Sequence, residues 1–199
     1  RPHGGARRRP RTARPRVARP GVIEVRPRVA EDVPVLCEVL AAQAEASGYP
    51  IRWPWSGPVE EFLVRRGEEQ AWTAVLTDEP GRPVGHVSVT RVGDDVDDDG
   101  DDGIAAGWLA ATGARCEDLA CISVLFVDQT CRHAGIGSAL LDAATAWIVD
   151  EGRTPVLDVV AQHHGIIELY RRRGWREVGT ADPPWLPEAR LVLMVLDGR

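Results

Sequence analysis

Residues 119–138 read LACISVLFVDQTCRHAGIGS, and this stretch decides the fold. Its first nine residues are almost continuously apolar, which is typical of a strand that is buried on both faces of a sheet. A short turn follows, and residues 136–149 then carry leucine, alanine, tryptophan and isoleucine at helical spacing. The stretch therefore predicts a buried strand, a turn and the beginning of a helix.

The junction between this strand and this helix favours the binding of a diphosphate. The first backbone N–H groups of a helix have no partner within the helix, and the helix dipole adds partial positive charge at the same end. Gly135 and Gly137 lack a Cβ atom, so a bulky anion can approach the main chain, and Arg132 adds a full charge. A tight turn without any ligand is the alternative interpretation.

Other glycine-rich cradles fit this junction less well. A Walker A loop needs a lysine, and the chain contains none. A dinucleotide-binding fingerprint needs a third glycine, which residues 135–140, GIGSAL, lack.

The rest of the chain predicts an α/β fold: one mixed sheet with helices on both faces. Strands are expected at residues 22–26, 71–77, 84–91, 119–127, 155–160, 176–180 and 191–196. Helices are expected at residues 32–46, 58–66, 136–149 and 165–173, with a further short helix at 105–111.

Two segments stand outside this pattern. Residues 1–21 carry eight arginines among prolines and glycines, and we expect a disordered tail ahead of one domain at residues 22–199. A basic arm that binds nucleic acid is the alternative interpretation of this tail.

Residues 93–103 carry seven aspartates and predict a solvated acidic loop. The twelfth position of a calcium loop counted from Asp94 is Ala105 rather than glutamate, so we expect no metal.

Charge and hydropathy exclude some classes of protein. Beyond the tail, 16 arginines face 30 acidic residues, so the body attracts cations and nucleic acid is not the expected partner. No apolar run reaches the length of about 18 residues that a membrane helix needs. No secretory apolar segment begins the chain, so we expect a cytoplasmic protein with reduced cysteines.

The chain resembles the GNAT superfamily of N-acetyltransferases in two motifs. In the first, a strand that ends in a valine precedes R-x-x-G-x-G, matched here by Val127, Arg132, Gly135 and Gly137. The second lies in residues 157–175, LDVVAQHHGIIELYRRRGW, where the matching residues are Leu169, Tyr170, Gly174 and Trp175. His163 stands where the family usually has asparagine, and Ile166 where it has alanine.

The resemblance implies a GNAT-like fold in which the strand at 119–127 and the strand at 155–160 splay apart around acetyl-CoA. The pantetheine arm would pair with the backbone of the first strand, and the pyrophosphate would rest on the following turn. The implied cofactor-binding residues are Leu125, Phe126, Val127, Arg132, His133, Ala134, Gly135, Ile136, Gly137, Ser138 and His163.

The implied reaction is direct attack of an amine on the thioester. An alkyl amine has a pKa near 10.4 and is almost entirely protonated at neutral pH, so a base must take its proton. The resemblance assigns the general acid for the departing thiolate to Tyr170. Glu117 and Asp118, just before the buried strand, are candidate bases, and solvated surface acids are the alternative interpretation of both.

The amine acceptor, a small molecule or a peptide, is expected over the loop GYPIRWPWSGP at residues 48–58. Tyr49, Trp53 and Trp55 can hold a cation there or pack as a hydrophobic plug, and His86 is a further candidate. The departures at His163 and Ile166 leave open a catalytically weak acyl-CoA-binding sensor or scaffold. The resemblance also leaves a homodimer open.

Overall fold

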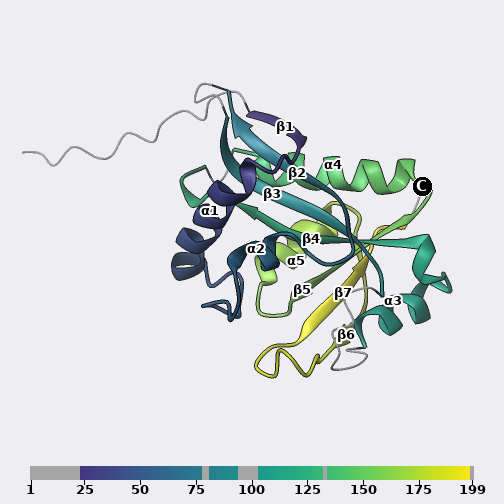
Figure 1. Cartoon of the computed structure of the whole chain (residues 1–199). Helices are drawn as coiled ribbons and strands as arrows, with labels where there is room; N and C mark the ends of the chain where they lie inside the picture. Colours follow the sequence, from purple (N-terminus) through teal and green to yellow (C-terminus); the bar gives the residue numbers. More distant parts are fainter. Residues whose placement is uncertain (1–22, 78–80, 94–102, 132–133, 198–199) are drawn as a thin grey trace, which may run out of the picture.

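The computed structural model describes residues 23–77, 81–93, 103–131 and 134–197 (Figure 1). The predicted tail at 1–21, most of the acidic loop at 93–103, and Arg132 and His133 lie outside the described residues. No helix among the described residues is long and apolar enough to cross a membrane.

Seven strands of the described residues form one mixed sheet. They are β1 Ile23–Pro27, β2 Glu68–Leu76, β3 Arg82–Arg91, β4 Leu119–Val127, β5 Thr154–Val160, β6 Arg176–Ala181 and β7 Leu191–Val195. Their order across the sheet is β1-β2-β3-β4-β5-β7-β6. Within the described part of the chain, only β4 and β5 pair in parallel, and every other neighbouring pair is antiparallel.

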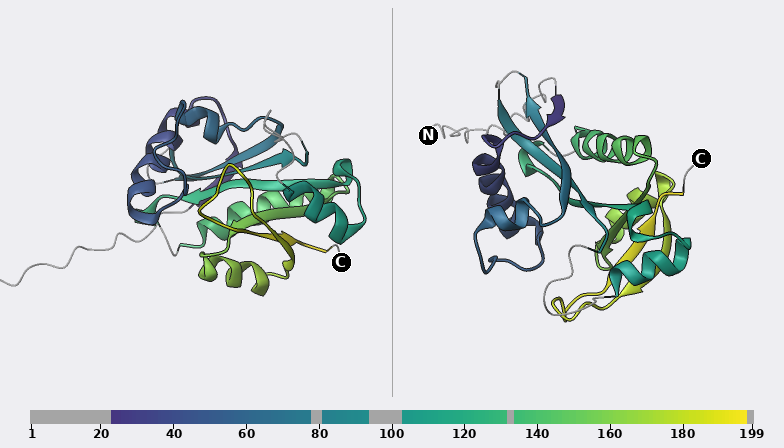
Figure 2. Two further views of the ribbon diagram at one scale, coloured as in Figure 1. Left: turned by 90° about the horizontal axis from the view of Figure 1, so that it is seen from below. Right: turned by 45° about the vertical axis from the view of Figure 1, so that its right-hand side comes forward.

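Helices cover both faces of this sheet (Figures 1 and 2). They are α1 Asp32–Ser47, α2 Val59–Leu63, α3 Ile104–Thr112, α4 Ile136–Asp150 and α5 His164–Arg172. On one face of the sheet, the apolar sides of α4 and α5 pack into a single core cluster. On the second face, α1 and α2 cover β4 and α3 packs against β6 and β7.

The predicted fold class is confirmed. Each predicted strand and helix is present, and the buried strand has the predicted bounds, Leu119–Val127. The differences are small: α2 is shorter than expected, while β2 begins three residues earlier. The first and last residues of a helix or strand depend on core packing as well as on local propensity. A local sequence pattern therefore predicts the presence of an element more accurately than its exact bounds.

The corner between β1 and α1 is fixed by Asp32. This carboxylate is 3% exposed and accepts hydrogen bonds from Arg26 Nη1 and Nη2, both at 2.7 Å, from Val29 N–H at 3.0 Å and from Thr73 Oγ1 at 2.9 Å. Burial alone would raise the pKa of Asp32, but these donors outweigh it and the net pKa is lowered. The carboxylate therefore stabilises the fold in its charged form.

We expect Asp32→Asn to lower the free energy of unfolding by about 2 kcal/mol, because buried donors lose a charged acceptor. Since the folded pKa is lowered, the wild-type advantage is fully present above about pH 4 and is lost as the pH falls through the folded pKa. Urea denaturation of both proteins checks this. Glu38→Gln, on the exposed side of the same helix, should change stability by less than about 0.5 kcal/mol. Equal losses in the two variants would contradict this role of Asp32.

Candidate active site

The candidate site is the opening between β4 and β5. The two strands pair only from Leu119–Thr154 to Cys121–Val156, after which the register ends. On its other edge, β5 stays paired with β7 as far as Val160. From Ile122 onward, one edge of β4 therefore faces the opening, where its backbone groups can pair with an extended ligand.

A bulge shapes β4 within this opening. The register with β3 passes from Ser88–Ser123 to His86–Phe126, so β4 carries one extra residue there. Val124, inside the bulge, has φ of 50°, the only positive value among the described residues other than glycine. A β-branched residue in this region costs about 1–2 kcal/mol, so surrounding contacts must hold it. The bulge directly precedes Leu125–Val127, the segment predicted to bind pantetheine.

The predicted phosphate turn leads into α4. Gly135 caps this helix with φ of 79°, a conformation that favours glycine, and a Cβ atom there would meet nothing within 4 Å. A Cβ atom at Gly137 would lie 3.6 Å from Val127 Cγ2. Ile136 is buried in the core and anchors the first turn, while Gly137 and Ser138 remain partly exposed. Open space beside the unpaired N–H groups of a helix fits a diphosphate.

Tyr170 reaches the opening from the face that carries α4 and α5. Its ring is 8% exposed and packs edge-on against Trp175, with centroids 5.8 Å apart. Burial raises the pKa of Tyr170 to about 12, and electrostatic interactions with Asp158 and Cys121 act in the same direction. Tyr170 therefore keeps its proton at neutral pH and lies within electrostatic reach of residues on both strands.

Asp158 is a candidate site residue that was not predicted from the sequence. It lies in the middle of β5 and is exposed, whereas its neighbours Leu157 and Val159 pack into the core beneath α4 and α5. Because side chains alternate along a strand, Asp158 points to the opposite face, the face of α1 and α2. The available signal was a lone carboxylate in the apolar run PVLDVV.

The aromatic loop lies partly at this site and partly in the core. Burial raises the pKa of Tyr49 well above its usual range, and electrostatic interactions with Tyr170 and Asp158 add to the rise against the opposing effect of Arg65. Tyr49 thus lies within electrostatic reach of both. Tyr49 and Trp55 both pack against Phe62 of α2, with ring centroids 6.4 Å and 5.1 Å away, and Trp53 is half-buried.

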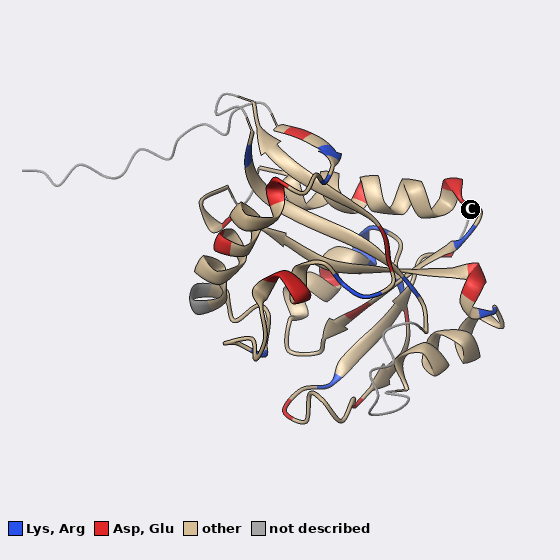
Figure 3. Ribbon diagram, in the orientation of Figure 1, with Lys and Arg blue, Asp and Glu red and all other residues tan. Residues whose placement is uncertain are grey.

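Glu117 and Asp118, the predicted bases, lie elsewhere. They precede β4 at the end where β4 and β5 are still paired, away from the opening. Figure 3 shows acidic residues in red on the segment before this end of β4. Arg115 pairs with Glu117 at 2.5 Å and with Asp118 at 3.2 Å, and it donates hydrogen bonds that lower the pKa of Asp118. Both carboxylates are solvated parts of a surface ion-pair group, so their location gives no support to a role as base.

Two histidines complete the predicted set. His86 is fully buried in β3 and both of its ring nitrogens have partners, which is the environment of a structural residue rather than of an acceptor contact. His163 is partly exposed and precedes α5, and its carbonyl accepts the N–H groups of Ile166 and Ile167. It therefore lies between β5 and the helix that carries Tyr170.

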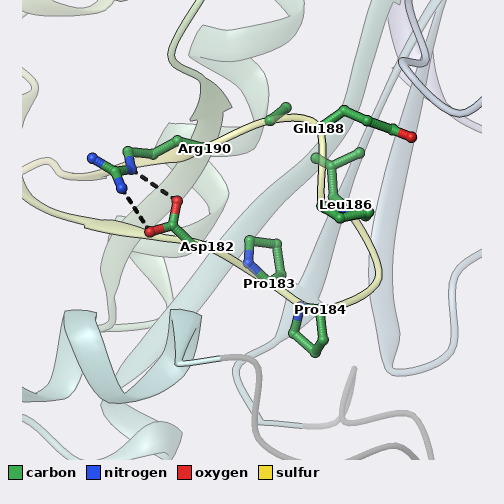
Figure 4. Close-up of a pocket in the computed structure, with 8 residues that line it drawn as sticks. Asp182, Pro183, Pro184, Leu186, Glu188 and Arg190 are labelled. Carbon is green, nitrogen blue, oxygen red and sulfur yellow. Dashed lines mark hydrogen bonds and ion pairs between the residues drawn. The ribbon is translucent and has the colours of Figure 1, made fainter.

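A surface depression of about 550 Å³ lies elsewhere, in the connection between β6 and β7 (Figure 4). Arg190 closes this loop with hydrogen bonds from Nε and Nη2 to Asp182, each at 2.8 Å. All eight lining residues belong to the loop itself, and none is a predicted site residue. Among the described residues, no group of three or more His, Cys, Asp or Glu side chains is placed to hold a metal ion.

Comparison with known proteins shows the family of the chain. The chain belongs to the acetyltransferase (GNAT) family, whose model matches residues 36–175. It is 28% identical over 124 residues to an uncharacterized N-acetyltransferase of Methanocaldococcus jannaschii. That match covers 62% of this chain and 46% of the relative, so the chain spans about half the length of the curated protein.

Solved structures share the fold. NAA60 of Arabidopsis thaliana, in complex with acetyl-CoA, is 22% identical with a TM-score of 0.61, and the match covers 87% of this chain and 97% of that one. The ribosomal-protein-S18-alanine N-acetyltransferase of Escherichia coli is 15% identical with a TM-score of 0.59, covering 89% and 96%. At this identity the likeness establishes the fold alone.

Proposed function

We propose that this protein transfers an acetyl group from acetyl-CoA to a primary amine, by direct attack within a ternary complex. The observation that carries the proposal is the opening between β4 and β5, with the first turn of α4 at its end and Tyr170 and Asp158 on its two sides. Family membership supports the same reaction class.

Backbone groups would make most of the contacts with acetyl-CoA, the acetyl donor. The unpaired edge of β4 at Leu125–Val127 can pair with the amide groups of pantetheine in the manner of an added strand. The N–H groups of Gly137 and Ser138 can donate to the diphosphate, with open space beside Gly135. The N-terminal end of α4 thus supplies the positive potential that a doubly charged diphosphate needs.

The acid and the base are assigned from opposite faces of the sheet. Tyr170 keeps its proton at neutral pH and can donate a hydrogen bond to the thiolate as it leaves. Asp158 lies on the face of α1 and α2, the expected acceptor side, and can take the amine proton directly or through one water molecule. We therefore infer that Asp158, rather than Glu117 or Asp118, is the general base.

The acceptor site would lie between Tyr49 and Asp158. An aromatic ring beside a carboxylate suits a cationic amine before it loses its proton. The E. coli neighbour is named for acetylating an alanine of a ribosomal protein. A further structure of similar fold, that of the NatC complex, was solved with a Gag peptide and CoA. Peptides with a free α-amine are accordingly the first acceptors to test.

The experiment that tests the proposed function has two parts. Calorimetry should show one acetyl-CoA site per chain, and mass spectrometry should show an added acetyl group on at least one amine from a panel of peptides, polyamines and amino sugars. Acetyl-CoA binding without transfer to any amine would favour the sensor or scaffold alternative. No binding of acetyl-CoA would refute the proposal as a whole.

A further inference from the structure

We propose that His86 is a positioning residue for the cofactor, which holds the bulge of β4 in the shape that presents Leu125–Val127 to the pantetheine arm. This inference rests on the proposed function. It assigns the residue a role through the backbone of β4 rather than through contact with either substrate.

The hydrogen-bond partners of His86 define its tautomer. Arg28 Nη1 lies 3.1 Å from His86 Nε2, and a guanidinium can only donate, so Nε2 accepts. The proton of the neutral ring is then on Nδ1, which donates to the carbonyl of Val124 at 3.1 Å. Full burial lowers the pKa of His86 to about 3, so the ring is neutral at physiological pH.

Arg28 is itself held in place. Its Nη1 and Nη2 donate to Glu68 at 3.0 Å and 2.5 Å, and both side chains are largely buried. The network therefore runs from the start of β2, through Arg28, to His86 on β3 and ends on the carbonyl of Val124. A fixed guanidinium allows the ring only one orientation, which directs Nδ1 at the bulge.

The bulge needs such a partner because Val124 adopts a positive φ that a valine rarely takes. The register between β3 and β4 steps over Val124 and Leu125, so the ladder alone does not fix this carbonyl. The His86 ring also lies against Phe126, with centroids 5.7 Å apart. Without the bond from Nδ1, the bulge can relax and turn the following backbone groups away from the opening.

The phosphate turn does not share this dependence. Ile136 fixes the first turn of α4 by burial in the core cluster beneath the opposite face of the sheet. A change at His86 should therefore weaken contacts with pantetheine and leave contacts with the diphosphate unchanged. This separation distinguishes positioning of β4 from a general loss of structure.

Two amide variants test the inference. In His86→Asn, the side-chain amide N–H can occupy the place of Nδ1 and still donate to Val124. In His86→Gln, the amide reaches the place of Nε2, so it can contact Arg28 but not Val124. Binding is measured by calorimetry with acetyl-CoA and by competition with adenosine 5′-diphosphate 3′-phosphate, the portion of coenzyme A that lacks pantetheine.

We expect acetyl-CoA affinity to fall about tenfold in His86→Gln, the effect of one lost hydrogen bond to a buried carbonyl. His86→Asn should stay within about threefold of the wild type, and both variants should bind the nucleotide portion as the wild type does. Equal loss in the two variants, or a parallel loss for the nucleotide portion, would overturn the inference.

A measurement on the unaltered protein does not depend on how the variants fold. The ring nitrogen shifts of His86 in a ¹⁵N spectrum should identify the neutral tautomer with its proton on Nδ1. A proton on Nε2, or a charged ring at pH 7, would also overturn the inference. If wild-type protein fails to bind acetyl-CoA, the proposed function fails; if it binds and only these expectations fail, the role of His86 alone is refuted.

Discussion

Gly135→Asp should weaken acetyl-CoA binding about 100-fold. The new carboxylate would stand at the N-terminal end of α4, within a few ångströms of the proposed diphosphate. Two like charges at such a separation near a protein surface repel by several kcal/mol, and 100-fold corresponds to only about 2.7 kcal/mol. Calorimetry with acetyl-CoA gives the affinity directly.

The chain offers a matched control at the other end of the same helix. Gly152 also has a positive φ, 74°, and a Cβ atom there would also meet nothing within 4 Å. Gly152→Asp therefore carries the same kind of backbone strain, about 1–2 kcal/mol, without placing charge near the opening. Its acetyl-CoA affinity should match the wild type. Equal weakening in both variants would attribute the loss at Gly135 to strain in α4 rather than to a phosphate site.

Tyr170→Phe and Asp158→Asn should each lower kcat about 100-fold while acetyl-CoA affinity stays within about twofold. Each removes one proton-transfer group and keeps the shape of the side chain, and such groups contribute about 10²–10⁴-fold to rate. Stopped-flow detection of free thiol with the best acceptor from the panel measures kcat. Because burial raises the pKa of Tyr170 to about 12, the wild-type rate should show no loss from its deprotonation below about pH 10.

Asp150→Asn, an exposed change at the end of α4, is the matched control for Asp158→Asn and should keep the wild-type rate. Glu117→Gln and Asp118→Asn separate the two assignments of the base. If either of them lowers kcat while Asp158→Asn does not, the base belongs to the surface ion-pair group before β4. An unaltered kcat in Tyr170→Phe would remove Tyr170 from the mechanism.

Local pattern was enough to predict the strand, the turn and the helix around residues 119–138. An apolar run and a 3.6-residue period are strong signals because burial of one face or stripe dominates the energy of such elements. The position of Gly135 just before the helix was also predictable, because the left-handed conformation of this N-cap residue favours glycine. The turn that we propose to hold the diphosphate could therefore be located from sequence alone.

The proposed base could not be located in this way, because its position depends on which strands diverge. Glu117 and Asp118 are close to β4 in sequence, yet they lie at its paired end. Asp158 is distant from β4 in sequence and reaches the opening only because β5 separates from β4 after Cys121. Nothing in the local pattern around Asp158 encodes that divergence.

The contacts of His86 could likewise not be predicted from the sequence. A histidine in an apolar strand predicts either a structural residue or a substrate contact, and only tertiary structure shows which atoms meet its ring. Here the partners come from Arg28 and from a bulge on the neighbouring strand. The bulge itself has no sequence signature, because Val124 is an ordinary strand residue in an unusual conformation.

We expect the main chain at the start of α4 to hold the diphosphate, and a crystal structure of the protein with coenzyme A would show whether it does. The diphosphate oxygens should lie about 2.7–3.2 Å from the backbone nitrogens of Gly137 and Ser138, with pantetheine along Leu125–Val127. A nucleotide bound elsewhere, with the turn before α4 free of ligand, would contradict the account.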